Sequence, residues 1–242
     1  MIQVRNLSKV FRIPHAKKKT LYHNLVSTFT KGYDYEQFYA LKDVSFDVKQ
    51  GEFVGIIGRN GSGKSTLLKI LSRIYRPTSG EVVIRESLFP LLELGVGFQP
   101  DFSVRDNIYL YGALLGFRRQ EMNSKLGEIL AFSELERFVD AKLEKLSSGM
   151  QMRLGFSIAI QSVAPIMLVD EVLAVGDLAF AEKCRRVFAE LREQKCTMLL
   201  VSHDLDSVKQ YCDRAIILDG GKLIAEGDSR AMVEQYQNTA FG

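Results

Sequence analysis

The segment GRNGSGKS, residues 58–65, places the strongest constraint on how this chain can fold. It follows the apolar run FVGII at residues 53–57 and precedes TLLKILSRI at residues 66–74. A short, unbroken apolar run is typical of a strand buried on both faces, as in a parallel sheet covered by helices. After the glycine loop, one helical face collects the apolar residues Leu67, Leu68, Leu71, Ile74 and Tyr75. We therefore predict a strand, a glycine-rich loop and a helix that continues to the RPTSG turn at residues 76–80.

The same segment carries the complete pattern G-x-x-x-x-G-K-S, and its position between strand and helix is that of a P-loop. Its glycines let backbone N–H groups curl around phosphate oxygens, and the helix N-terminus adds favourable partial charge. Lys64 would contact the β- and γ-phosphates, Ser65 would ligate Mg²⁺, and Thr66 would add a phosphate contact. The alternative is a glycine turn that only connects strand to helix. The pattern favours binding of ATP with Mg²⁺ through Gly58, Asn60, Gly61, Ser62, Gly63, Lys64, Ser65 and Thr66.

Three further apolar runs predict buried strands of the same kind: IMLV at 166–169, MLLV at 198–201 and AIIL at 215–218. The stretch ILDGGKLIAEGD has a turn at residues 219–221 between two apolar segments, which predicts a β-hairpin. Between about residues 104 and 163 the sequence has many helix formers and no convincing strand. We predict an α/β fold of the P-loop NTPase class, with a mainly parallel core sheet and a helical lobe inserted between two of its strands.

Composition leaves the partner open but bears on where the chain is located. The net charge of +3 is too small to indicate a nucleic-acid partner, and we predict none. Three cysteines without metal-ligand spacing are typical of buried, reduced thiols in a cytosolic protein. The sequence shows no secretory signal pattern and no apolar run of about 18 residues. We therefore predict a chain that does not cross a membrane itself.

Residues 14–38 form a basic segment that differs from the rest of the chain. Four lysines precede its first acidic residue, Asp34, namely Lys17, Lys18, Lys19 and Lys31. The apolar residues Leu21, Leu25, Val26 and Phe29 are spaced as they would be on one face of a helix. Two interpretations stay open: a solvated insertion with a short amphipathic helix, or a contact with a partner or an anionic membrane surface.

Two acids and a histidine follow predicted strands, at the sheet edge where ligands of open α/β sheets bind. Asp170 can complete the Mg²⁺ shell, and Glu171 can polarise the water that attacks the γ-phosphate. Without a P-loop, such acids would more often cap a helix. His203 can donate to the γ-phosphate, although a lone histidine at a strand end is more often structural. We predict Asp170 as a metal ligand, and Glu171 and His203 as catalytic residues.

The segment LSSGMQMRLGFSIAI, residues 146–160, resembles the LSGGQ signature of ABC ATPases, with Met150 in place of the signature glutamine. The resemblance implies that Ser147, Ser148 and Gly149 contact the ATP held by a second subunit, so that a homodimer encloses two ATP molecules. It also implies an antiparallel β part beside the core sheet, and a single nucleotide-binding domain over residues 1–242.

Other residues match ABC motifs in the order that the family shows. Gln99 in GVGFQPD resembles the Q-loop glutamine, which contacts Mg²⁺ and the attacking water on the hinge to the helical lobe. Asp177 resembles the D-loop residue at the dimer interface. Two aromatic residues are candidates for stacking on adenine, Phe11 and Tyr39, and the sequence does not decide between them.

A narrower resemblance links the chain to the ATPase subunits of bacterial polysaccharide exporters. It is carried by LSSGM, by DEVLAVGD at residues 170–177 and by the basic insertion. It implies that ATP-driven dimer closure powers export of a lipid-linked polysaccharide, such as O-antigen, through integral membrane permease subunits. The chain would then be peripheral, at the cytoplasmic face of the inner membrane.

Some members of that group have a C-terminal carbohydrate-binding domain, which we do not expect within residues 1–242. Two interpretations stay open: this member lacks the domain, or the sequence is part of a longer chain. Two alternatives to polysaccharide export stay open as the function. One is the ATPase of a drug, lipid or other small-substrate transporter, and the other is a soluble ABC ATPase without a transport role.

Overall fold

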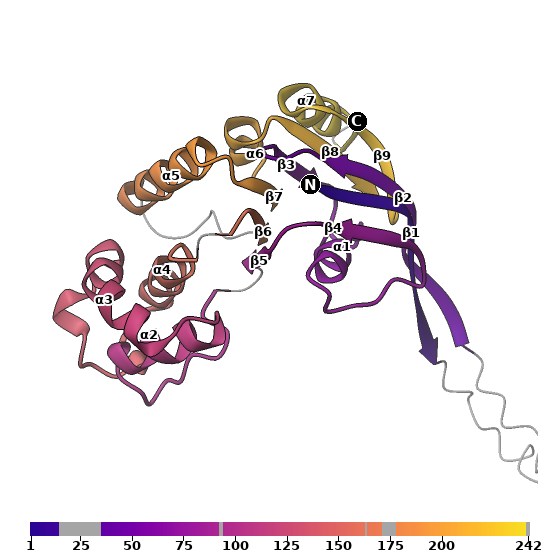
Figure 1. The fold of residues 1–242 in the computed structure, drawn as a ribbon. Helices are drawn as coiled ribbons and strands as arrows, with labels where there is room; N and C mark the ends of the chain where they lie inside the picture. Colours follow the sequence, from indigo (N-terminus) through magenta and orange to yellow (C-terminus); the bar gives the residue numbers. More distant parts are fainter. Residues whose placement is uncertain (15–34, 92–93, 163, 171–177, 241–242) are drawn as a thin grey trace, which may run out of the picture.

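A six-stranded sheet forms the centre of the molecule (Figure 1). The computed structural model describes residues 1–14, 35–91, 94–162, 164–170 and 178–240. The strand order is β5 (Leu88–Leu91), β6 (Ile166–Asp170), β7 (Thr197–Val201), β3 (Phe53–Ile57), β8 (Arg214–Asp219) and β9 (Lys222–Asp228). Neighbouring strands run parallel from β5 to β8, and β9 pairs antiparallel with β8. The predicted parallel core and the predicted hairpin are both confirmed.

Both faces of this sheet are covered, which explains the unbroken apolar runs. Alternate strand residues face α1 (Lys64–Leu71) on one side, among them Val54, Ile56, Leu199 and Ile216. The residues between them face α5 (Leu178–Glu193), α6 (Leu205–Tyr211) and α7 (Ser229–Ala240) on the other. Among the described helices, none combines the length and apolar character needed to span a bilayer.

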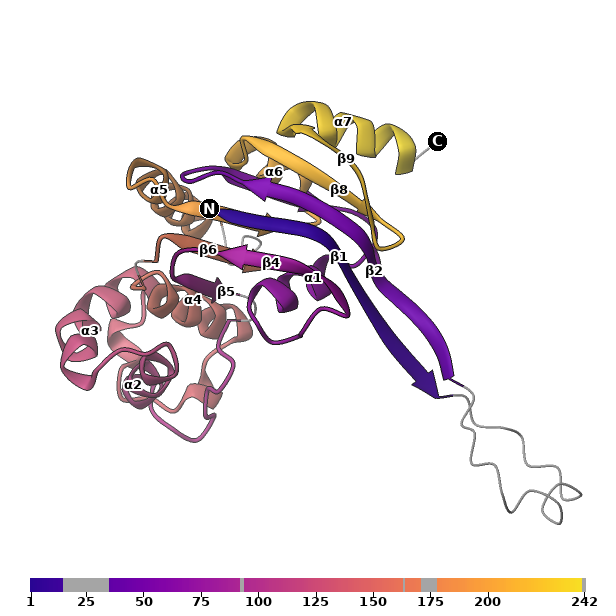
Figure 2. The same ribbon diagram turned by 45° about the vertical axis from the view of Figure 1, so that its right-hand side comes forward.

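A second, three-stranded sheet lies over α1, in the order β2 (Tyr35–Val48), β1 (Ile2–Pro14) and β4 (Ser79–Ile84). Its strands are antiparallel, as the family resemblance implied. The far ends of β1 and β2 leave the body as a two-stranded ribbon (Figure 2). Of the predicted insertion at residues 14–38, Pro14 ends β1 and residues 35–38 begin β2. The helix expected around residues 21–29 lies outside the described residues.

The helical lobe is inserted between β5 and β6, as predicted. It contains α2 (Val104–Leu114), α3 (Arg119–Ser133), α4 (Ser148–Ala159) and the 3₁₀ turns η2 (Glu136–Phe138) and η3 (Leu143–Lys145). The lobe has its own apolar core, which includes Val104, Ile108, Met122, Ile129, Leu154 and Ile158. Figures 1 and 2 both show it on the side of the core sheet away from the β1–β2 ribbon.

The helix predicted after the glycine loop ends earlier than expected, at Leu71. Arg73 adopts a left-handed conformation with φ 61°, and the N–H of Ile74 donates back to the Lys69 carbonyl at 2.8 Å. This bond pattern closes a helix C-terminus. The prediction that Ile74 and Tyr75 continue the helical face was wrong, because apolar spacing does not reveal a left-handed residue.

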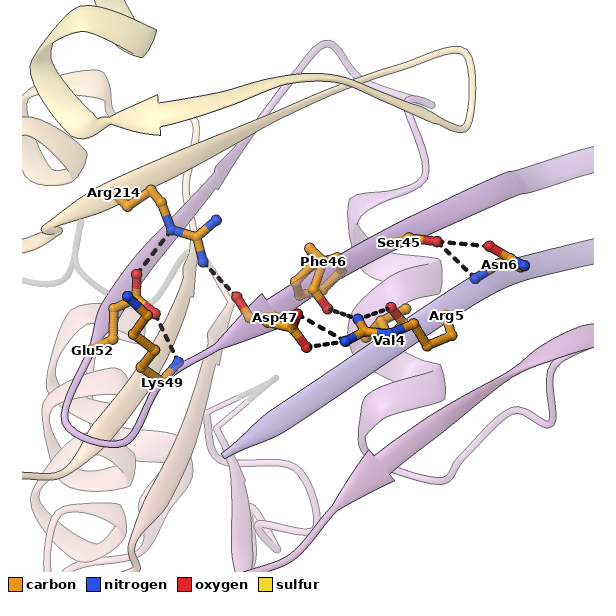
Figure 3. A network of polar contacts seen from close by, with 9 residues as sticks. All are labelled: Val4, Arg5, Asn6, Ser45, Phe46, Asp47, Lys49, Glu52 and Arg214. Carbon is orange, nitrogen blue, oxygen red and sulfur yellow. Dashed lines mark hydrogen bonds and ion pairs between the residues drawn. The ribbon is translucent and has the colours of Figure 1, made fainter.

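A polar network joins the two sheets at the end of β3 away from the glycine loop (Figure 3). Arg5 of β1 donates two bonds of 2.8 Å to the Asp47 carboxylate of β2. Arg214 of β8 donates to the Asp47 carbonyl at 2.5 Å and to Glu52 at 2.9 Å. The exposed Arg5–Asp47 pair stabilises the fold little, and the Arg214–Glu52 pair is more buried. Their effect here is to connect β1, β2 and β8, which are distant in sequence.

Candidate functional site

Three parallel strands end side by side at one edge of the core sheet. Their register aligns Ile56 of β3 with Val201 of β7, and Val201 with Asp170 of β6. The glycine loop at residues 58–65 follows β3, and the turn that carries His203 follows β7. Both segments therefore leave the sheet at the same edge. The topology thus brings to one edge the segments that carry three kinds of predicted residue: those that bind phosphate, the metal ligand, and the histidine that donates a hydrogen bond to the γ-phosphate.

Contacts with two other strands require glycine in the loop. A Cβ atom on Gly63 would lie 2.5 Å from the Ala40 carbonyl oxygen of β2, and one on Gly58 would lie 2.1 Å from the Leu218 carbonyl oxygen of β8. Gly63 also has φ 106°, which disfavours any residue with a side chain. Neither position can take a larger residue unless a neighbouring segment moves.

Lys64 begins α1, and its ammonium group lies inside the curve of the loop. Although the residue is buried, Nζ donates to the carbonyl oxygens of Gly58 at 2.6 Å and of Arg59 at 3.1 Å. Such bonds offset part of the cost of burying a cation. They also keep one positive charge against the loop backbone, where it can pair with a phosphate oxygen.

Ser62 gives a second indication that the loop accepts a polar ligand. The residue is buried, and its Oγ atom has no hydrogen-bond partner among the described residues. Buried hydroxyls are nearly always paired, so an unpaired one needs an explanation. The N-cap of α1 is Gly63, which offers no side chain to the first helical N–H groups. These donors together fit a phosphate group.

Ser65 and Asp170 line one cleft of about 490 Å³ between the sheet edge and the helical lobe, which we call the Ser65 cleft. The lobe contributes Tyr111, Leu114 and Leu115 to it. Mg²⁺ prefers oxygen ligands and commonly takes one or two from the protein beside the phosphates of a substrate. A hydroxyl and a carboxylate in one cleft fit that requirement.

His203 lies exposed in the turn between β7 and α6. The Ser202 hydroxyl accepts the N–H of Asp204 at 3.0 Å, and Asp204 caps the N-terminus of α6. These bonds define the turn that carries the histidine. The predicted catalytic residue Glu171 and the predicted interface residue Asp177 lie outside the described residues.

The signature segment begins α4 in the helical lobe. Ser147 is the N-cap, and its hydroxyl accepts the N–H of Met150 at 3.3 Å. Ser147 and Ser148 are exposed, and a side chain on Gly149 would meet open space. None of these three is among the described residues that line the Ser65 cleft. The predicted phosphate donors of the signature thus lie apart from that cleft in their own chain.

Gln99 is exposed on the loop between β5 and α2. Its Nε2 donates to the carbonyl oxygen of Gly97 at 3.3 Å. Val96 of the same loop lines the Ser65 cleft, whereas Gln99 is not part of its described lining. The structure therefore brings the loop, but not the glutamine side chain, to the predicted metal site.

The two adenine-stacking candidates have different surroundings. The Phe11 ring packs edge to face on Tyr75, with 5.7 Å between ring centroids. Tyr39 is exposed on β2 and precedes Ala40, whose carbonyl oxygen lies against Gly63 of the glycine loop. Tyr39 is thus attached to a segment that touches the loop, while the Phe11 ring is engaged elsewhere.

Sequence reasoning missed Asn107, a fully buried polar residue of α2 that bonds to the Gln99 backbone. The sequence does hold a signal for it. Asn107 falls among Val104, Ile108 and Tyr111, which follow helical spacing and are buried. A polar residue on an apolar helix face predicts a buried hydrogen-bond partner, but the spacing does not name that partner.

Known proteins resemble this chain in sequence along most of its length. A family model described as ABC transporter matches residues 41–174. The O-antigen export system ATP-binding protein RfbB of Klebsiella pneumoniae is 42% identical over 201 residues, which are 83% of this chain and 82% of the relative. The teichoic acids export ATP-binding protein TagH of Lactococcus lactis subsp. lactis is 38% identical over 237 residues, 98% of this chain. The chain spans only 50% of the length of TagH.

The fold also matches a solved structure, described as a dimeric post-hydrolysis state of the ATP-binding cassette MJ0796 bound to ADP and Pi. The TM-score is 0.74 at 27% identity, over 95% of this chain and 99% of that one. Sequence, fold and the phosphate-loop geometry agree. The chain therefore belongs to the ABC transporter family, as an ATP-hydrolysing subunit related to the O-antigen and teichoic acid export ATPases.

Proposed function

We propose that two copies of this chain enclose two ATP molecules and power export of a lipid-linked polysaccharide through a membrane permease. The observation that carries the dimer is the exposed start of α4, where Ser147, Ser148 and Gly149 lie apart from the Ser65 cleft of their own chain. Hydroxyl and N–H donors at a helix N-terminus suit a phosphate that a second copy supplies. The similar cassette MJ0796, described as dimeric, supports this arrangement.

In each site, the loop and the sheet edge bind the phosphates. Lys64 and the loop N–H groups hold the β- and γ-phosphates, and Ser62 gains a partner for its buried hydroxyl. Ser65 and Asp170 would hold Mg²⁺, which would supply positive charge to the phosphate oxygens. Tyr39 stacks on adenine, because its strand touches the loop at Ala40.

Three residues act on the attacking water and the γ-phosphate. Glu171 orients or deprotonates the water, and Gln99 contacts the same water and the metal. His203 donates to the γ-phosphate from the turn after β7. Hydrolysis removes the ligand that bridges the two copies, so ATP favours the closed dimer and its loss favours the open one.

The permease docks through its coupling helix at the groove beside Gln99, on the helical-lobe side of the Ser65 cleft, whereas Mg²⁺ belongs to the sheet-edge side, where Ser65 and Asp170 lie. Three side chains that line the cleft are large, apolar and unusually exposed: Ile74 at 59%, Val96 at 55% and Leu114 at 61%. Grouped apolar exposure of this kind is typical of a contact surface for a partner. The cleft also joins the sheet edge to the helical lobe, so dimer closure would move the docked helix.

The relatives support a glycan as the substrate. They are named for export of O-antigen and of teichoic acids. A chain that supplies only the ATPase needs integral membrane subunits for the passage itself. The chain is then peripheral, bound through its permease at the cytoplasmic face of the inner membrane.

Purification of the chain from detergent-solubilised membranes tests the transport proposal. Mass spectrometry should identify a polytopic permease in equal amount, encoded beside glycosyltransferases. Leu114→Asp should reduce its recovery, whereas Ile224→Asp should not, because Ile224 is 56% exposed but lies on β9 away from the cleft. Recovery of ribosomes, of nucleic acid or of no partner would contradict transport, and a permease beside non-glycan genes would contradict the substrate.

A variant that binds ATP without hydrolysing it tests the dimer. Glu171→Gln should retain ATP, nearly lose turnover and form a dimer with saturating Mg-ATP, as measured by light scattering after size exclusion. The same change combined with Lys64→Ala should remain monomeric. A monomeric Glu171→Gln chain at saturating Mg-ATP would refute the enclosed-ATP model.

A further inference from the structure

We propose that Asn107 is a positioning residue for Gln99, whose backbone it ties to the helical lobe through a fully buried carboxamide. The inference rests on the proposed role of Gln99 at the metal and the attacking water. Asn107 itself would touch neither of them.

The carboxamide of Asn107 bonds to both backbone polar groups of Gln99. Oδ1 accepts the Gln99 N–H at 2.7 Å, and Nδ2 donates to the Gln99 carbonyl oxygen at 2.9 Å. Two strands exchange the same pair of bonds at a hydrogen-bonded position of an antiparallel sheet. One side chain of α2 thus replaces a neighbouring strand and fixes both the position and the orientation of the Gln99 backbone.

The remaining bonds of Asn107 tie the loop to the start of its own helix. Nδ2 also lies 3.3 Å from the Phe102 carbonyl oxygen and 3.0 Å from that of Ser103, the N-cap of α2. Its two N–H groups are therefore shared among three carbonyl oxygens. Asn107 is 0% exposed, so bulk water does not compete for these bonds while the amide is present.

The rest of this loop is also packed against the lobe. Phe98 lies edge to face on Tyr111 of α2, with ring centroids 5.1 Å apart. On α4, a Cβ atom at Gly155 would lie only 3.0 Å from the backbone nitrogen of Gly95. Residues 95–99 are thus held by two helices of the lobe, and any movement of the lobe carries them with it.

The side chain of Gln99 is the exposed part of this arrangement. Its reach toward the metal site depends on the position of its backbone, because among the described residues the side chain makes a single hydrogen bond, of 3.3 Å, to the Gly97 carbonyl oxygen. A misplacement of about 1 Å at a reacting centre can cost about 100-fold in rate. Because Asn107 ties the Gln99 backbone to α2, a movement of the lobe would move Gln99 with it.

A double-mutant cycle on the full chain separates positioning from general support of the lobe. Asn107→Ala should lower kcat of ATP hydrolysis about tenfold and leave KM within about twofold, since phosphate binding does not involve the loop. In a Gln99→Ala background, Asn107→Ala should cause no further loss of kcat. The matched control is Ser133→Ala: Ser133 is also 0% exposed in the lobe, but among the described residues its hydroxyl bonds to carbonyl oxygens of α3 alone. This control should keep kcat within about twofold of the wild type.

Two results would overturn the inference. One is a full tenfold loss from Asn107→Ala in the Gln99→Ala background, and the other is an equal loss of kcat in Ser133→Ala. Asn107→Asp repeats the cycle if the alanine variant does not fold, because it keeps the shape and the Oδ1 acceptor but loses the amide donor. A Gln99→Ala chain as active as the wild type would refute the proposed role of Gln99, and this inference with it. A slow Gln99→Ala chain with independent Asn107 effects would refute the inference alone.

Discussion

Replacing Gly63 by alanine should destabilise the chain more than the same replacement at Gly61. Both glycines have positive φ, 106° and 81°, which costs a residue with a side chain about 1–2 kcal/mol. A methyl group on Gly61 would meet no atom within 4 Å, whereas on Gly63 it would lie 2.5 Å from the Ala40 carbonyl oxygen and 2.9 Å from Leu41 Cδ2. Overpacking of this kind adds about 1–3 kcal/mol. We expect losses in unfolding free energy of about 1–2 kcal/mol for Gly61→Ala and about 2–5 kcal/mol for Gly63→Ala.

Thermal unfolding without nucleotide measures this difference. Each kcal/mol shifts Tm by about 2–4 °C for a chain of this size, so the two variants should differ by roughly 2–12 °C. Gly61→Ala is the matched control, since it shares the loop and the positive φ but lacks the close contact. Equal midpoints would show that β2 yields without cost, and would refute the argument that the loop is packed tightly against it.

Three further predictions concern the nucleotide site and the thiols. Lys64→Ala should weaken ATP binding at least about tenfold by calorimetry, because it removes a charged phosphate contact; unchanged affinity would contradict the loop assignment. Stacking of a base on an aromatic ring contributes about 1–3 kcal/mol. Tyr39→Ala should therefore weaken ATP binding more than Phe11→Ala does. The opposite order would exclude Tyr39 as the residue that stacks on adenine. Burial raises the pKa of each cysteine thiol, so a thiol reagent at pH 8 should label the folded chain slowly and the unfolded chain fully. Rapid labelling would contradict these raised pKa values, which are about 12 for Cys184, about 11 for Cys196 and about 12 for Cys212.

The buried parallel strands could be predicted from the sequence because both of their faces are covered. In β3, β6, β7 and β8 nearly every residue is buried, so a short apolar run is sufficient evidence of a strand. The antiparallel strands of the three-stranded sheet gave no comparable signal, unlike the β8–β9 hairpin. The pairing of β1 with β2 shifts register between Val4 and Leu7, and Asn6 and Asp43 have positive φ, which interrupts the two-residue alternation.

The candidate site could be predicted as a set of residues but not as a geometry. Motif spacing predicts Lys64, Ser65 and Asp170 as site residues, and parallel topology explains why Ser65 and Asp170 line one cleft at the sheet edge. The direction of the Gln99 side chain and the partner of Asn107 depend on packing between the loop and the lobe. Spacing along the chain contains no information about that packing.

The glycine loop is held between segments that are far apart in sequence. The Gly221 N–H donates to the Ser62 carbonyl at 3.1 Å, and the Gly221 carbonyl accepts the Lys42 N–H at 2.8 Å, so loop, β8–β9 turn and β2 form one chain of bonds. We therefore expect the shape of the loop to depend on the assembly of both sheets. A nucleotide that binds this shape would stabilise the whole domain against unfolding, in proportion to the logarithm of its concentration.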